Sequence, residues 1–86
     1  MTRISNTQRF DEELNRLFKK DKRYMKKMEK TIKLLKADLG YPSLRFHKLE
    51  GRDCYSISVD MKIRVIFGIR DDTILLLRVG THDEVY

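Results

Sequence analysis

The chain has 86 residues, 37% of them charged, and a formal net charge of +6 at pH 7. A chain of this length can fold around one modest hydrophobic core, so we expect a single domain over residues 1–86. Because no stretch approaches the length of a transmembrane helix and the N-terminus lacks the apolar region of a secretory signal, the sequence excludes a membrane-spanning protein, and we expect a cytoplasmic protein with no membrane partner.

The first half of the chain predicts a short strand followed by two helices. We expect the strand at residues 3–5 and a first helix that begins with a capping box of Ser5 and Gln8. Asp21 can cap a second helix, which ends near Gly40. The apolar positions expected to face the core are Phe10, Leu14, Leu17 and Phe18 on the first helix and Met25, Met28, Ile32, Leu35 and Leu39 on the second. The short link between the helices predicts an antiparallel helical hairpin.

After Pro42 the pattern changes to an alternation of apolar and polar residues, which is typical of strands. Residues 43–52 form a loop or an irregular strand. The alternating runs that follow are at residues 55–59, 61–69 and 74–79. Turn residues separate these runs, so we expect an antiparallel meander. The predicted fold class is therefore α+β, with the N-terminal helical hairpin packed on one face of a small antiparallel sheet.

Sheet parity predicts which side chains leave the core. The residues expected to face the helices are Ile63, Val65 and Phe67 on one strand and Leu75, Leu77 and Val79 on the next. Arg64 and Arg78 then point to the other face, with Ser56 and Ser58 alongside. Both arginines share that face only if the connection around residues 71–72 has an odd number of residues or if a bulge interrupts the hairpin. The hydrophobic pattern therefore predicts an odd loop and an open sheet face that carries both arginines.

Basic residues are concentrated in the second predicted helix. Residues 19–36 hold nine lysines and arginines and only two acidic residues, so the rest of the chain is nearly neutral. Such a stripe is typical of a polyanion-binding surface, and Lys26, Lys30 and Lys33 are candidates for RNA contacts there. A solvated helix face or a strongly acidic partner would explain the stripe equally well.

The C-terminal segment carries three reactive groups at a spacing of four: Arg78, His82 and Tyr86. In a turn that follows a strand, this spacing can bring the three side chains toward a common point. A guanidinium binds phosphate, an imidazole exchanges protons near neutral pH, and a phenol stacks on a base or donates a hydrogen bond. These groups are suited to cutting RNA without a metal. The alternative is that Val85 and Tyr86 only dock the C-terminus on the core.

Metal and cofactor sites are not expected. The two histidines, Cys54 and Asp83 show no recognised metal-ligand spacing. The single cysteine cannot form an internal disulfide, which fits a reducing cytosol. We interpret Cys54 as a small buried strand residue.

Three segments stand out together: LRFHKLEG at 44–51, KIRVIF at 62–67 and VGTHDEVY at 79–86. They resemble the RelE/ParE superfamily of bacterial and archaeal type II toxins, and most closely its RelE/YafQ-type mRNA interferases. The resemblance implies a toxin that enters the ribosomal A site and cleaves mRNA, so that the ribosome and mRNA are its partners. It also implies a cognate antitoxin, commonly acidic, that holds the toxin inactive. We expect a monomer when the toxin is free and a hetero-oligomer with the antitoxin.

The catalytic residues implied by the resemblance are His47, Arg64, Arg78, His82 and Tyr86. Arg64 matches the catalytic arginine of the penultimate strand, and His47 matches the loop histidine of the YafQ-like branch. The histidine that this branch places on the first long strand has no counterpart, because Tyr55 and Ser56 occupy that region. The departure leaves the identity of the general base open.

The implied reaction is attack of the substrate's own 2′-hydroxyl on the adjacent phosphate, which needs a general base and a general acid. His47 and His82 are the candidates, and the sequence does not assign the two roles. Arg64 and Arg78 would stabilise charge in the transition state, and Tyr86 would stack on an unpaired base. The side chains expected to bind the phosphate backbone nearby are Arg45, Lys48 and Lys62.

Two other functions fit the same fold. A ParE-type toxin that poisons DNA gyrase would share the fold and the antitoxin, but it has no need of two proton-transfer groups. The pair of histidines therefore favours a ribonuclease. A catalytically silent relative that retains only antitoxin binding would also fit the sequence.

Overall fold

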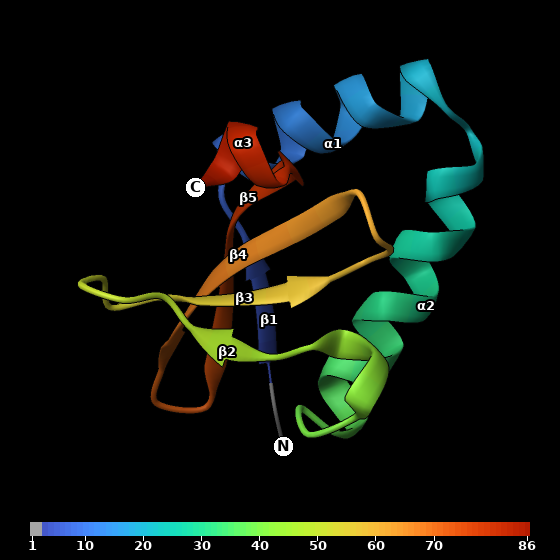
Figure 1. The fold of residues 1–86 in the computed structure, drawn as a ribbon. Helices are drawn as coiled ribbons and strands as arrows, with labels where there is room; N and C mark the ends of the chain where they lie inside the picture. Colours follow the sequence, from blue (N-terminus) through green and yellow to red (C-terminus); the bar gives the residue numbers. More distant parts are fainter. Residues whose placement is uncertain (1–2) are drawn as a thin grey trace.

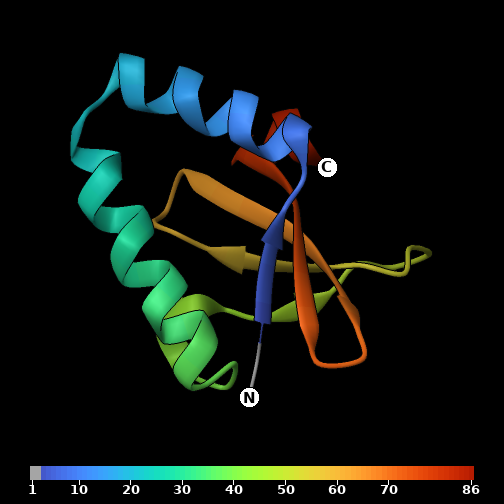
Figure 2. The ribbon, with the colours of Figure 1, turned by 180° about the vertical axis from the view of Figure 1, so that it is seen from behind.

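The computed structural model describes residues 3–86 and shows an α+β fold in which two helices cover one face of a five-stranded sheet (Figures 1 and 2). The elements in chain order are β1 (Arg3–Asn6), α1 (Gln8–Lys20), α2 (Arg23–Ala37), the 3₁₀ helix η1 (Pro42–Leu44), β2 (His47–Lys48), β3 (Tyr55–Ser58), β4 (Ile63–Arg70), β5 (Thr73–Thr81) and α3 (His82–Val85). The fold class and the N-terminal strand are confirmed. Within residues 3–86, the helices are too short or too polar to cross a membrane.

The sheet has the strand order β1-β5-β4-β3-β2. Strands β2 to β5 form the expected antiparallel meander. Strand β1 runs parallel to β5, so the sheet is mixed rather than purely antiparallel. The direction of β1 is set by the helix that follows it, because the chain leaves β1 beside the middle of β5 and enters α1 there. At this point the Thr7 amide donates to the Leu76 carbonyl oxygen at 3.1 Å.

The helix caps differ in part from the prediction. Thr7 caps α1, since its hydroxyl oxygen accepts from the Phe10 amide at 3.2 Å, whereas Ser5 lies within β1 and cannot form the expected capping box. The N-cap of α2 is Lys22 and not the expected Asp21, although the Asp21 carboxylate accepts from the Arg23 amide at 3.0 Å and so stabilises the start of the helix. Helix α2 ends at Ala37, earlier than predicted.

The two helices form a corner rather than an antiparallel hairpin (Figures 1 and 2). Helix α1 crosses the end of the sheet and α2 runs down its side, because each helix packs on the sheet and not mainly on the other. The buried residues of α2 are Tyr24, Met28, Thr31 and Leu35. The predicted stripe is therefore wrong at Met25, which is 54% exposed. Tyr24 takes the inward position because its hydroxyl bonds to Asp60 in the β3–β4 turn.

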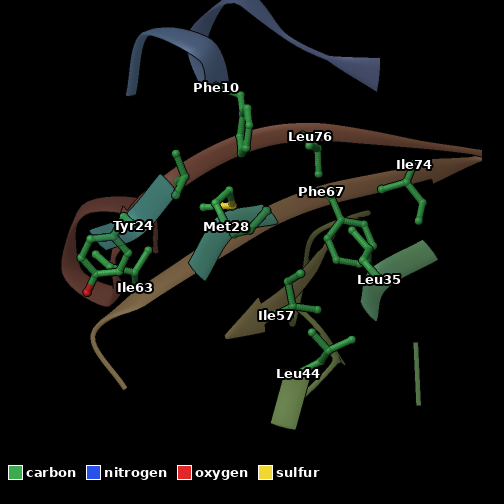
Figure 3. Close-up of a cluster of buried hydrophobic side chains, with 12 residues drawn as sticks. Phe10, Tyr24, Met28, Leu35, Leu44, Ile57, Ile63, Phe67, Ile74 and Leu76 are labelled. Carbon is green, nitrogen blue, oxygen red and sulfur yellow. The ribbon is translucent and has the colours of Figure 1, made fainter. Parts of the chain in front are cut away.

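The core lies between these helices and the sheet (Figure 3). Its buried members are Phe10, Tyr24, Met28, Leu35, Leu44, Ile57, Ile63, Val65, Phe67, Ile74, Leu76 and Val79. Both helices, η1 and three strands contribute, so the core ties the N-terminal half of the chain to the meander.

The β4–β5 hairpin lacks the predicted odd loop, and a bulge, the other feature that can place both arginines on one face, takes its part. Arg70 pairs with Thr73 across a two-residue turn, and the register shifts between Ile66 and Phe67, which leaves Leu77 as the extra residue of β5. Before the bulge, Ile74 and Leu76 face the core, so the expected core positions Leu75 and Leu77 are wrong; Leu75 is 37% exposed.

Beyond the bulge, the side chains of β5 alternate between the core face and the outer face as predicted. Val79 faces the core, and Arg78 pairs with Ile66 on the opposite face. Arg64 pairs with Gly80 on that same face. The two arginines therefore share the outer face, as the alternation predicted.

Asp60 fixes the β3–β4 turn. Its carboxylate accepts from the Tyr24 hydroxyl, from Lys27 Nζ at 3.1 Å and from the amides of Lys62 and Ile63 at 2.9 and 2.8 Å. Burial alone would raise the pKa of Asp60, but these hydrogen bonds outweigh it and lower the pKa to about 2. Burial and the Asp60 bond raise the pKa of Tyr24 to about 12.

We expect Asp60→Asn to lower the free energy of unfolding at pH 7 by about 1–2 kcal/mol, because the amide keeps the shape but loses the charge. The folded-state pKa of Asp60 lies below its unfolded value, so its contribution is complete above about pH 4 and is lost as the pH falls toward 2. Urea unfolding at several pH values measures this difference, with the exposed Asp72→Asn variant as control. A difference that stays constant down to pH 2 would contradict the account.

Candidate active site

Helix α3 folds back over the outer face of the sheet. Thr81 caps it, since the Thr81 hydroxyl oxygen accepts from the Glu84 amide at 3.3 Å and the Glu84 carboxylate accepts from the Thr81 amide at 2.8 Å. Hydrogen bonding to the Glu84 carboxylate, first from the Thr81 amide and then from the Thr81 side chain, lowers the pKa of Glu84. Val85 is 2% exposed and packs with Leu49, Cys54 and Ile66 in a second apolar cluster.

Val85 therefore docks the C-terminal segment on the protein, which is the packing role that the sequence offered as the alternative. Ile66 alternates with Val65 and Phe67 along β4, so this second cluster lies on the face opposite the main core. The outer face is not open as predicted, because α3 covers its centre. Cys54 is buried there, as expected.

Tyr86 brings the two histidines together. Its hydroxyl lies 3.2 Å from His47 Nε2, and its ring centroid lies 4.1 Å from that of His82 and 6.4 Å from that of His47. The hydroxyl also bonds to Ser56 Oγ on β3. His47 Nδ1 in turn lies 3.1 Å from the carbonyl oxygen of Arg45. We call His47, Ser56, His82 and Tyr86 the Tyr86 cluster.

Arg78 is held by α1. Its guanidinium bonds to the Glu13 carboxylate, with Nη2 at 2.7 Å and Nε at 3.4 Å, and Glu13 also accepts from the Val79 amide at 3.2 Å. The hydrogen bonds that Arg78 donates to Glu13 raise the pKa of Arg78. The spacing of four therefore brings His82 and Tyr86 together but leaves Arg78 out. The Arg78 side chain points instead to Glu13 of α1, which lies next to β5 beyond the end of β1.

The register places the cluster and Arg78 on one line across the sheet. His47 pairs with Ser56, Ser56 with Ile66, and Ile66 with Arg78. Neighbouring strands are about 4.8 Å apart, so the Cα atoms of His47 and Arg78 are about 14 Å apart, with α3 lying over the middle of the line.

Arg64 lies on the neighbouring line, between Ser58 and Gly80. Its Nη1 donates to the carbonyl oxygens of Asp60 at 2.7 Å and Ile63 at 3.4 Å, so its guanidinium is turned toward the β3–β4 turn. Both predicted arginines are thus on the outer face and oriented by acceptors of this chain.

The basic candidates fall into two groups. Arg45, Lys48 and Lys62 are exposed, and the first two adjoin His47. Lys26, Lys30 and Lys33 line a shallow hollow along α2 with Glu29, which lies 3.5 Å from Lys33 Nζ. Because α2 packs on the main core and α3 on the opposite face, the α2 lysines are remote from the Tyr86 cluster. Among residues 3–86, no group of three or more histidine, cysteine and acidic side chains is placed to hold a metal ion.

The sequence model of a family described as the bacterial toxin of type II toxin-antitoxin system, YafQ, matches residues 2–86. The chain belongs to the YafQ toxin family. The predicted resemblance is confirmed. A comparison with curated protein sequences finds no match.

Solved structures share the whole fold of this YafQ-family toxin. A metal-bound toxin from Helicobacter pylori is 25% identical, with a TM-score of 0.83 and 100% of both chains covered. YafQ from Escherichia coli strain BL21(DE3) is 19% identical, with a TM-score of 0.83 over 100% of this chain and 99% of that one. A chain of the E. coli DinJ-YafQ toxin-antitoxin complex is 20% identical, with a TM-score of 0.81 and the same coverage.

Three residues that contact the site of this YafQ-family toxin were not among the predicted site residues. Ser56 was expected on the outer face, but nothing local links it to Tyr86, which is thirty positions away. Arg52 donates to the Tyr86 carbonyl oxygen at 3.1 Å and lines a shallow hollow with His47, Lys48, Leu49, Glu50 and Tyr86. Glu13 binds Arg78, but nothing in the sequence around Glu13 indicates this contact beyond its position on a helix.

Proposed function

We propose that this toxin is an endoribonuclease that cleaves mRNA on the ribosome without a metal, and so stops translation in the cytoplasm. The observation that carries the proposal is the Tyr86 cluster, in which two imidazoles flank one phenol on an exposed face. Histidine is the side chain that exchanges protons near neutral pH, and cleavage by the 2′-hydroxyl needs one group to take a proton and one to give it.

The two arginines supply the charge that such a reaction needs. A guanidinium has five N–H donors, and Glu13 accepts from only two nitrogens of Arg78, so Arg78 keeps donors for a phosphate oxygen. Arg64 uses Nη1 for main-chain carbonyl oxygens and is held in the same way. Donors that are oriented before the reaction stabilise the charge that develops on the phosphate. The proposed catalytic residues are His47, Arg64, Arg78, His82 and Tyr86.

Substrate RNA would reach the cluster along the hollow beside Tyr86, which Lys48 and Arg52 line. Arg45 and Lys62 would bind the backbone further out. On the far side, the α2 lysines would contact a second polyanion, either ribosomal RNA or an antitoxin.

An antitoxin is also part of the proposal. The E. coli relative is seen with DinJ in a toxin-antitoxin complex. We propose that an acidic antitoxin binds this toxin through the basic surface of α2, forming a hetero-oligomer from a free monomer. A segment that folds on binding could cover α2 without reaching the Tyr86 cluster.

We expect the free toxin to cleave ribosome-bound mRNA at least a hundredfold faster than the same naked transcript. The cluster lies on an exposed face with shallow hollows, so the ribosome must hold the flexible strand in line. Primer extension on programmed ribosomes and on free transcript measures both rates.

Equal rates on both substrates would contradict the ribosome dependence. If expression of the toxin stops DNA synthesis first while translation continues, the ParE-type alternative holds instead. Binding of the antitoxin with no cleavage under any condition would support the silent-relative alternative.

A further inference from the structure

The main chain before His47 selects the tautomer of its ring. His47 Nδ1 lies 3.1 Å from the Arg45 carbonyl oxygen. A carbonyl oxygen only accepts hydrogen bonds, so this contact requires a proton on Nδ1. Arg45 presents that carbonyl with a left-handed backbone (φ 50°), which is uncommon for a residue with a side chain. In the neutral ring the lone pair is then on Nε2, the atom 3.2 Å from the Tyr86 hydroxyl.

Ser56 completes a chain of three groups. It is 0% exposed, and its hydroxyl bonds to that of Tyr86. A hydroxyl donates one hydrogen bond and accepts others, so the bonds between these three groups can run in either direction. With neutral His47, Ser56 donates to Tyr86 and Tyr86 donates to Nε2. With protonated His47, Nε2 donates to Tyr86, whose hydroxyl proton turns to Ser56.

We propose that the Tyr86 hydroxyl carries the proton of the RNA 2′-hydroxyl to His47, and that Ser56 is the positioning residue that orients this hydroxyl. The inference rests on the proposed ribonuclease function and adds to it a role for the phenol other than stacking. Tyr86 is 37% exposed and lines the hollow beside the exposed His47, so a ribose would approach its oxygen from the solvent side while buried Ser56 holds that oxygen from within.

The step balances in protons and bonds. The 2′-oxygen forms a bond to phosphorus while its proton moves to Tyr86 Oη, and the Tyr86 proton moves to His47 Nε2. The bond from phosphorus to the 5′-oxygen breaks, and protonated His82, whose ring lies against that of Tyr86, gives that oxygen a proton. The products are a 2′,3′-cyclic phosphate, a 5′-hydroxyl, neutral tyrosine, protonated His47 and neutral His82. Proton exchange with water restores both rings.

The first test does not depend on activity. Nitrogen-15 NMR of toxin labelled at histidine reports which ring nitrogen carries the proton in the neutral form of His47. We expect Nδ1–H in the wild type and in the Tyr86→Phe variant, because the Arg45 carbonyl selects it. A neutral His47 with its proton on Nε2 could not receive the tyrosine proton, and this result would overturn the relay whether or not the protein cleaves RNA.

The second test is kinetic and uses programmed ribosomes. Tyr86→Phe keeps the ring and removes the hydroxyl, so kcat should fall about tenfold to a hundredfold while KM changes little. Ser56→Ala should lower kcat about tenfold, and Ser56→Thr, which restores a hydroxyl, should recover part of the loss. If Ser56→Ala fails to fold, Tyr86→Phe alone decides. A Tyr86→Phe variant as fast as the wild type would overturn the relay and leave the ribonuclease intact.

A modified substrate separates the two ends of the relay. With sulfur in place of the 5′-oxygen, the leaving group needs no proton, so the rate of His82→Gln should recover. Tyr86→Phe should stay slow on the same substrate. Recovery of Tyr86→Phe would place the phenol on the leaving-group side and overturn the inference. If the wild type cleaves neither substrate, the proposed function fails and the relay fails with it.

Discussion

Removing residues 83–86 should abolish growth arrest while antitoxin binding persists. The deletion takes Tyr86 away from His47 and Ser56, and it removes the ring that His82 contacts. The α2 surface proposed for the antitoxin lies on the other face of the sheet and is untouched. Growth assays and antitoxin affinity, measured on the purified truncated toxin, test both halves of this prediction.

Stability must be separated from catalysis in that experiment. The deletion also removes buried Val85, which should lower the free energy of unfolding by about 1.5–3 kcal/mol. The matched control ends at Val85: it keeps this packing and loses only Tyr86. We expect it to be nearly as stable as the full chain and about as inactive as the longer deletion. A toxin without residues 83–86 that still arrests growth would show that the tail serves packing alone.

His47→Gln and His82→Gln should each reduce cleavage on the ribosome by about a hundredfold or more. Glutamine keeps a polar side chain but cannot exchange a proton near neutral pH, and general acid–base groups contribute about a hundredfold to ten-thousandfold each. Both rings are exposed, so the free energy of unfolding should change little. Single-turnover cleavage of mRNA on programmed ribosomes compares both variants with the wild type.

Asp83→Asn is the control for the histidine variants. Asp83 Oδ1 lies 3.6 Å from His82 Nδ1, but the side chain is fully exposed and solvent screens the pair. Its rate should stay within a few-fold of the wild type. A histidine variant that retains the wild-type rate would remove that residue from the proposed mechanism.

Local patterns predicted the architecture well. Alternation predicted the strands, and placing Arg64 and Arg78 on one face required an odd loop or a bulge. The expected odd loop is absent, and a bulge at Ile66 and Phe67 meets the requirement instead. The position of that bulge could not be predicted, because residues 74–77 are all apolar and either alternate pair could face the core. The pattern therefore predicts Leu75 and Leu77, whereas Ile74 and Leu76 are the buried pair.

The features that the sequence did not predict depend on contacts between elements far apart in the chain. Met25 has the right spacing for a core residue, but Tyr24 turns inward because Asp60, far along the chain, accepts its hydroxyl. Arg78 shares a helical spacing with His82, yet Glu13 of α1 takes its guanidinium. The site itself was predicted by residue type through the family resemblance, whereas the bond between Ser56 and Tyr86 follows only from the fold.

The chemical ends of the cut mRNA test the central claim most directly. If the Tyr86 cluster catalyses attack by the 2′-hydroxyl, mRNA cleaved on programmed ribosomes must carry a 2′,3′-cyclic phosphate upstream of the cut and a 5′-hydroxyl downstream, with or without a chelator. Mass spectrometry of the upstream fragment and labelling of the downstream end by polynucleotide kinase identify both groups. A 3′-hydroxyl with a 5′-phosphate, or cleavage that a chelator stops, would contradict the account.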